Sequence, residues 1–171
     1  SDVCSSDLLL DVRAFADRGL AAGTLTLIVV FGVMFGIFLV LYPFFQAVLG
    51  WSALRAATAM LPMAAAMMPL STQAPRIAAR IGKRNTMLGG VVIFASGLVS
   101  MAMMASVEGG YLSILPGLLL IGVGMGLTMT PSTEVITETL PADKQGVASA
   151  INDTSRELGG ALGVALLGSV L

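Results

Sequence analysis

The sequence predicts an all-α membrane protein, a bundle of about five transmembrane helices. Only 11% of its 171 residues are charged and 56% are hydrophobic, whereas a soluble domain carries roughly 25% charged residues. Four stretches contain no Asp, Glu, Lys or Arg, and each is at least as long as the ~20 residues that a helix needs to cross a bilayer. These stretches are 19–54, 56–75, 85–107 and 109–133. The chain therefore has too little polar sequence to cover a soluble core.

Five helices follow from these stretches and from the segment after them. We expect them to span about residues 20–41, 52–73, 86–106, 112–133 and 145–171. Pro43 should end or bend the first helix because proline lacks an amide donor. Ser52, after a glycine and a tryptophan, is a suitable N-cap for the second helix, which should end before Pro75.

The residue inventory excludes several classes of chemistry. The chain has no histidine, and Cys4 is its single cysteine. It therefore offers no disulfide framework, no Cys/His metal site and no histidine base, and we expect no metal and no cofactor. A net charge of −1, without a basic excess, argues against nucleic acid as a partner. An intramembrane enzyme would need a nucleophile or metal constellation, which the sequence lacks.

The distribution of basic residues predicts the orientation in the membrane. With five crossings, Arg55 alone falls on the side opposite the N-terminus, and the other cations share the N-terminal side. They are Arg13, Arg18, Arg76, Arg80, Lys83, Arg84, Lys144 and Arg156. Cytoplasmic loops are enriched in Lys and Arg, so we expect a multi-pass protein of the cell membrane with a cytoplasmic N-terminus. Tyr42, Trp51 and Tyr111 fall at the opposite interface, where aromatic rings are favoured.

Pairs of glycines four residues apart predict close helix packing. Small residues at this spacing let two membrane helices approach each other. The pairs are Gly32 and Gly36, Gly122 and Gly126, and Gly159 and Gly163. The alternative is that glycine is simply common in membrane helices.

Three segments resemble one family of membrane proteins. The loop "PRIAARIGKRNTML" (75–88) resembles the cytoplasmic loop signature of the major facilitator superfamily, and "LYPFFQAVLGWSALRAATAMLP" (41–62) and "GVASAINDTSRELGGALGVALLGSVL" (146–171) resemble its fourteen-helix drug/proton antiporter branch. The resemblance implies a partial C-terminal domain over residues 8–171, formed by helices nine to thirteen. It also implies proton-coupled export of hydrophobic or cationic small molecules by alternating access against a missing N-terminal half. A membrane assembly or channel subunit is the alternative.

The chain departs from the family pattern in two places. Ala79 replaces the aspartate of the loop signature, while Arg80, Gly82, Lys83 and Arg84 match it. We therefore expect a degenerate copy of the loop, in which Gly82 makes the turn and the cations meet helix C-termini. Residues 1–7, "SDVCSSD", do not fit the pattern, and we expect them to be a non-native leader.

Charges at the start of the fifth helix form the candidate functional site. Asn152, Asp153, Arg156 and Glu157 are spaced by three and four, which predicts one helix face shared with the glycines. We expect Arg156 to pair with Asp153 or Glu157, because unpaired charge in a membrane is costly.

Two roles remain open for this pair. It locks the inner end of the helix, or one carboxylate binds the proton or a cationic substrate, since removal from water raises the pKa of a carboxyl group. Glu134 on the fourth helix is a second candidate for the transport pathway, with a position at the interface beside Glu138 as its alternative.

Overall fold

The computed structural model describes residues 16–106 and 108–169, and this part of the chain is helical with short connections and no strand. The expected leader, residues 1–7, lies outside the described residues, as does Cys4. The helices are α1 (Arg18–Pro43), η2 (Phe44–Val48), α2 (Ala53–Thr58), α3 (Leu61–Ile81), α4 (Lys83–Met104), α5 (Gly110–Thr139), η3 (Ala142–Lys144) and α6 (Gln145–Gly168).

Four segments are long and apolar enough to cross a membrane by length and composition. They are Arg18–Val48, Ala53–Ile81, Lys83–Met104 and Gly110–Thr139. The fifth long helix, α6, has 24 residues against 22 in α4, but it carries three charges between residues 153 and 157. The all-helical class with five long helices is thus confirmed, and four of the five lie within the apolar spans.

Prolines end fewer helices than the sequence predicted. Pro43 lies inside α1, and the chain continues beyond it as the π-helical turn η2. The expected end of the second helix before Pro75 is wrong, because α3 passes through both Pro69 and Pro75. Membrane helices tolerate proline where neighbouring groups satisfy the freed carbonyls. The second span is instead broken at residues 59–60, just before Pro62.

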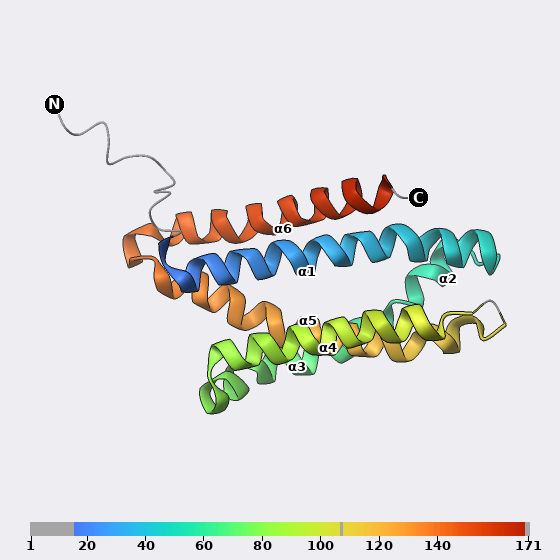
Figure 1. Cartoon of the computed structure of the whole chain (residues 1–171), viewed down its shortest axis with the longest axis horizontal. Helices are drawn as coiled ribbons and strands as arrows, with labels where there is room; N and C mark the ends of the chain where they lie inside the picture. The colour runs from blue at the N-terminus through green and yellow to red at the C-terminus, as the bar shows by residue number, and fades with distance from the viewer. Residues whose placement is uncertain (1–15, 107, 170–171) are drawn as a thin grey trace.

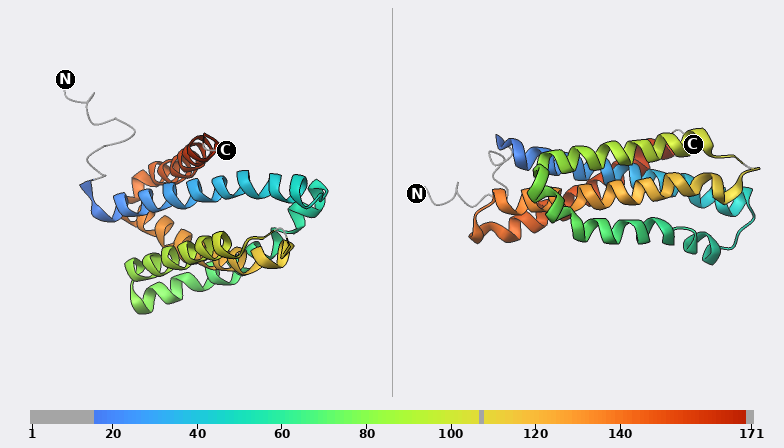
Figure 2. Two further views of the ribbon diagram at one scale, coloured as in Figure 1. Left: turned by 45° about the vertical axis from the view of Figure 1, so that its right-hand side comes forward. Right: turned by 90° about the horizontal axis from the view of Figure 1, so that it is seen from below.

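The helices form two packed groups joined through contacts of α5 with α1 and α6. In the first group α1 and α6 lie side by side and run in the same direction, and in the second α5 packs between α3 and α4 (Figure 1). The right-hand view of Figure 2 shows α5 between α4 and α3. Smaller contacts of α5 with α1 and with α6 hold the two groups together.

Glycines form the contact between α1 and α6. A Cβ atom on Gly163 would overlap the backbone of Gly32, and one on Gly159 would overlap the carbonyl group of Ile28. A Cβ on Gly32 would lie 2.9 Å from the Gly159 carbonyl oxygen. Gly36 faces the side chain of Leu167 at the outer end of the same contact. The two backbones therefore touch directly along several turns.

Three alternate glycines on α5 serve two different neighbours. Cβ atoms on Gly122 and Gly126 would meet the carbonyl oxygens of Met63 and Met67 on α3, whereas one on Gly124 would lie 2.5 Å from the Phe94 amide nitrogen on α4. Two residues correspond to about 200° of rotation on a helix, so adjacent members of this run face opposite sides. The α4–α5 contact continues through Gly90, Gly97 and Gly117. These glycines are not part of the pairs spaced by four residues that the sequence predicted as helix contacts.

An aromatic cluster closes the end of the bundle at which α1 ends and α5 begins. Phe45 stacks on Trp51 with ring centroids 5.4 Å apart, and Trp51 lies 5.7 Å from Tyr111. The Tyr111 hydroxyl donates a hydrogen bond of 2.7 Å to the Ala59 carbonyl oxygen at the break between α2 and α3. The start of α5 is thereby tied to the loop that follows α1.

Replacing Gly163 by alanine should destabilise the bundle, because its methyl group has to enter the backbone of Gly32. Overpacking of this kind costs typically ~1–3 kcal/mol. Gly146 on the same helix is the matched control: among the described residues nothing lies within 4 Å of the place that its Cβ atom would take, so it should tolerate alanine. Thermal unfolding in detergent micelles measures both variants. Equal melting temperatures would show that the α1–α6 contact does not depend on glycine.

Candidate functional site

The polar start of α6 is attached to α5 by a buried amide. Asn152 is 9% exposed, and its side-chain oxygen accepts a hydrogen bond of 3.1 Å from the Thr133 hydroxyl. One turn further, the buried Ser155 hydroxyl donates to the Ile151 carbonyl oxygen of its own helix. The polar side chains of Asn152 and Ser155 on this side of α6 therefore have hydrogen-bond partners inside the bundle.

Arg156 faces an aromatic ring on α1. Its guanidinium carbon lies 5.2 Å from the ring centroid of Phe31, a distance at which the ring quadrupole attracts a cation. Its Nε atom is buried and has no hydrogen-bond partner among the described residues. The expected ion pair with Asp153 or Glu157 is not present within residues 16–106 and 108–169, so the ring replaces the carboxylate as the neighbour of this charge.

Asp153 and Glu157 lie on the exposed side of α6. The buried line of the helix runs through Asn152, Gly159 and Gly163. At about 100° per residue, Asp153 and Glu157 are turned by about 100° and about 140° from Asn152, whereas Arg156 is turned by only about 40°. The expectation that all four residues share one inward face is therefore wrong for Asp153 and Glu157. The face that α6 buries is narrower than the spacing of three and four suggests.

The carboxylates on α6 lie well inside the length of the bundle. Gly159 contacts Ile28, which is about 15 Å along α1 from its start at Arg18. Because α1 and α6 run in parallel (Figure 1), Glu157 is at a similar depth, about one turn or less nearer that end. Glu157 also lines an open hollow of about 500 Å³ whose other residues are apolar or small, among them Phe35, Gly160 and Val164.

A second charged cluster joins α4 to α5. The Lys83 ammonium lies 3.6 Å from a carboxylate oxygen of Glu134 and forms a closer ion pair with Glu138. Lys83 is in this position because Gly82 turns the chain with φ of 89°, a conformation that favours glycine. Glu134 therefore lies beside Glu138 at the end of the bundle. This agrees with the alternative to a role in the transport pathway.

The other cations of the loop motif have no ion pair in the described part of the chain. Arg80 and Arg84 are exposed, at the end of α3 and in the first turn of α4. The loop cations were expected to meet helix C-termini, whereas Lys83 pairs with two carboxylates on α5 that the sequence did not point to. The spacing of four between Glu134 and Glu138 was the available signal, since it places both carboxylates on one side of a helix.

Metal binding has no support in the structure. Across residues 16–106 and 108–169, no group of three or more His, Cys, Asp and Glu side chains comes close enough to hold an ion.

The helices are long and apolar, pack through glycine, and carry few charges, which lie near the helix ends or on one helix face. These features define a multi-pass α-helical membrane protein. Residues 6–164 match the family model of the Major Facilitator Superfamily. The chain therefore belongs to the major facilitator superfamily, a family of membrane transporters rather than enzymes.

The chain is similar to several drug-resistance transporters. It is 33% identical to the Multidrug resistance protein Stp of Mycobacterium tuberculosis over 167 residues, which are 98% of this chain and 31% of the relative. It is 30% identical to the Multidrug resistance protein B homolog of the same organism, over 95% of this chain and 30% of the relative. The Quinolone resistance protein NorB of Staphylococcus aureus is 30% identical, over 95% of this chain and 35% of the relative. The chain thus spans about a third of the length of these relatives.

Replacing Lys83 by glutamine should weaken the contact between α4 and α5 only slightly. The three side chains are partly exposed, and such pairs contribute about 0.2–1 kcal/mol. Thermal unfolding in detergent at low and high salt measures the effect, which should shrink at high salt. Arg80→Gln removes a charge that has no ion pair among the described residues from the same end, and serves as the control. A salt-independent loss of several kcal/mol would contradict this description of the cluster.

Proposed function

We propose that this chain forms the first five helices of the C-terminal half of a transporter that exports hydrophobic or cationic small molecules in exchange for protons. The similarity to drug-resistance transporters over nearly the whole chain carries the proposal. Family membership favours transport over the alternative of an assembly or channel subunit.

The packing of the helices supports alternating access. α1 contacts α6 through glycines, α5 contacts α3 through glycines, and α1 and α5 meet between these two pairs. Transporters that work by alternating access are commonly built from two inverted repeats around such a centre. The missing N-terminal half would face this domain, and the substrate would bind between the two.

Glu157 is our candidate for the proton-binding group. Its carboxylate is exposed from the bundle, has no ion pair among the described residues, and lies beside the hollow lined by Phe35. A charged side chain at membrane depth is costly unless it faces a partner or water, so this side of α6 would line the transport pathway.

The membrane orientation is part of the proposal. The ends of α3 and α4 that carry Arg76, Arg80, Lys83 and Arg84 are expected in the cytoplasm, with the N-terminus on the same side. The aromatic cluster of Phe45, Trp51 and Tyr111 would then lie at the outer surface.

A cysteine at Asn85 tests this orientation. Asn85 is exposed in the first turn of α4, and a Cys4→Ser background removes the single cysteine of the sequence. In intact cells, an impermeant thiol reagent should leave the new cysteine unmodified and should react only after the membrane is opened. A cysteine at Gln46, exposed at the other end of the bundle, is the control and should react from outside. The reverse pattern would overturn the topology.

Glu157→Gln in the longer native protein tests the coupling role. The variant should fold and bind drugs but should lose the pH dependence of drug affinity, because an amide replaces the carboxylate proposed to bind the proton. Drug affinity measured against pH on purified protein is the readout. Glu138→Gln, which changes a carboxylate paired with Lys83 at the end of the bundle, is the matched control and should keep the pH profile. An unchanged profile for Glu157→Gln would remove this residue from the mechanism.

A further inference from the structure

An aromatic ring holds Arg156 inside the contact between α1 and α6. The guanidinium carbon lies 5.2 Å from the centre of the Phe31 ring, and Phe31 is only 9% exposed. A cation over an aromatic face is attracted more strongly where water is excluded. The Nε atom of Arg156 is buried without a hydrogen-bond partner among the described residues, so the ring is the group that compensates this charge there.

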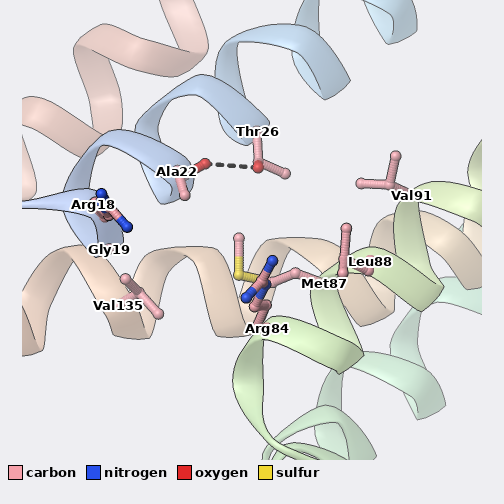
Figure 3. A pocket seen from close by; sticks show the side chains of 9 residues that line it. All are labelled: Arg18, Gly19, Ala22, Thr26, Arg84, Met87, Leu88, Val91 and Val135. Carbon is pink, nitrogen blue, oxygen red and sulfur yellow. Dashed lines mark hydrogen bonds between the residues drawn. The ribbon is translucent and has the colours of Figure 1, made fainter.

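This contact is not a general property of the arginines in the bundle. Arg18 and Arg84 border a cavity between α1 and α4 whose other lining residues carry no aromatic ring (Figure 3). Arg55 lies over Trp51, with 4.3 Å between its guanidinium carbon and the ring centroid, but it is exposed. Within the described part of the chain, Arg156 is therefore the one arginine that lies over a buried ring.

Two carboxylates close to Arg156 on its own helix do not pair with it. Asp153 is three residues before Arg156 and Glu157 is the next residue, and neither forms an ion pair in the described part of the chain. Residues three apart on a helix are neighbours, so Asp153 is within reach of Arg156 once the ring no longer holds it. α1 offers no other carboxylate, because residues 19–54 contain no charged side chain.

The position of Arg156 sets the charge that α6 presents on its exposed side. With the guanidinium over Phe31, Asp153 and Glu157 are two exposed carboxylates without a paired cation among the described residues. An ion pair between Arg156 and Asp153 would cancel one of these charges. A cationic compound would then meet a less negative surface, whereas a neutral compound would meet the same apolar surroundings.

We propose that Phe31 determines the preference for cationic over neutral substrates by holding Arg156 away from the carboxylates of α6. Phe31 acts through Arg156 and is therefore a positioning residue. This role rests on the proposed function, in which the exposed side of α6 lines the transport pathway.

The test is the binding of two related probes to the longer native protein, purified in detergent and measured by equilibrium dialysis. Tetraphenylphosphonium is a hydrophobic cation, and triphenylphosphine oxide is a neutral counterpart. Phe31→Leu should bind the cation about tenfold more weakly and the neutral probe within about twofold of the native affinity, because the released Arg156 neutralises one carboxylate. Phe31→Tyr keeps a ring at this position and should retain the affinity for the cation.

Removing Arg156 separates positioning from packing. Because the ring already holds Arg156 away from the carboxylates, Arg156→Gln alone should change the affinity for the cation by less than about threefold. In Phe31→Leu/Arg156→Gln no arginine is left to neutralise Asp153, so the affinity should return close to the native value. Such a recovery is a coupling between the two positions, which a loss of packing would not produce.

Phe94→Leu is the matched control, since Phe94 is a buried ring with no cation over it in the described part of the chain. This variant should leave the ratio of the two affinities unchanged.

Equal losses for both probes in Phe31→Leu, or a loss for the cation that persists in the double variant, would show that Phe31 only packs. A tenfold or larger gain for the cation in Arg156→Gln would show that Arg156 already neutralises the carboxylates, and would overturn the proposal even where Phe31→Leu does not fold. Failure of the proposed function is a different result. Native protein that binds neither probe would contradict it and the role of Phe31 with it, whereas the same cation preference in native protein and in Phe31→Leu would overturn the role of Phe31 alone.

Discussion

Direct contact between helix backbones is the constraint on which the rest of this structure depends. In lipid, apolar side chains gain little by meeting each other, so membrane helices associate through close packing and through polar contacts between helices. Here Gly163 lies against Gly32, Gly159 against Ile28, and Gly124 against Phe94, with no room for a methyl group between them. These contacts fix which helices are neighbours, and they place α6 with its polar side in a defined rotation against α1.

The same packing divides the charges of the chain into two kinds. At the end of the bundle, where water is available, Lys83 finds two carboxylates on α5 and the cluster is an ordinary partly exposed ion pair. On α6, Arg156 lies over the ring of Phe31 while Asp153 and Glu157 point away from the bundle. A carboxylate at this depth that turns away from its own domain is suited to a surface that meets water or a second domain. For this reason the transport proposal centres on α6.

A helix that serves two neighbours needs small residues on two sides. α5 packs between α3 and α4, and its run of alternate glycines supplies one contact surface for each. α1 has α6 and α5 as packed neighbours, and cavities separate it from α4 in the part of the chain that the structure describes.

The sequence by itself determined the helical class, the number of long helices, the cap at Ser52 and the turn at Gly82, because each follows from local chemistry: charge-free length, a side-chain acceptor, and a φ that favours glycine. It did not determine where helices pass through proline, since the freed carbonyls are satisfied or left exposed by neighbours that are distant in the chain. The sequence also did not determine which groups lie next to the charged side chains. Only the tertiary structure decided that Lys83 meets Glu134 and Glu138 and that Arg156 meets Phe31 instead of a carboxylate of its own helix, because the rotation of each helix is set by backbone contacts with another helix and not by its own pattern of residues.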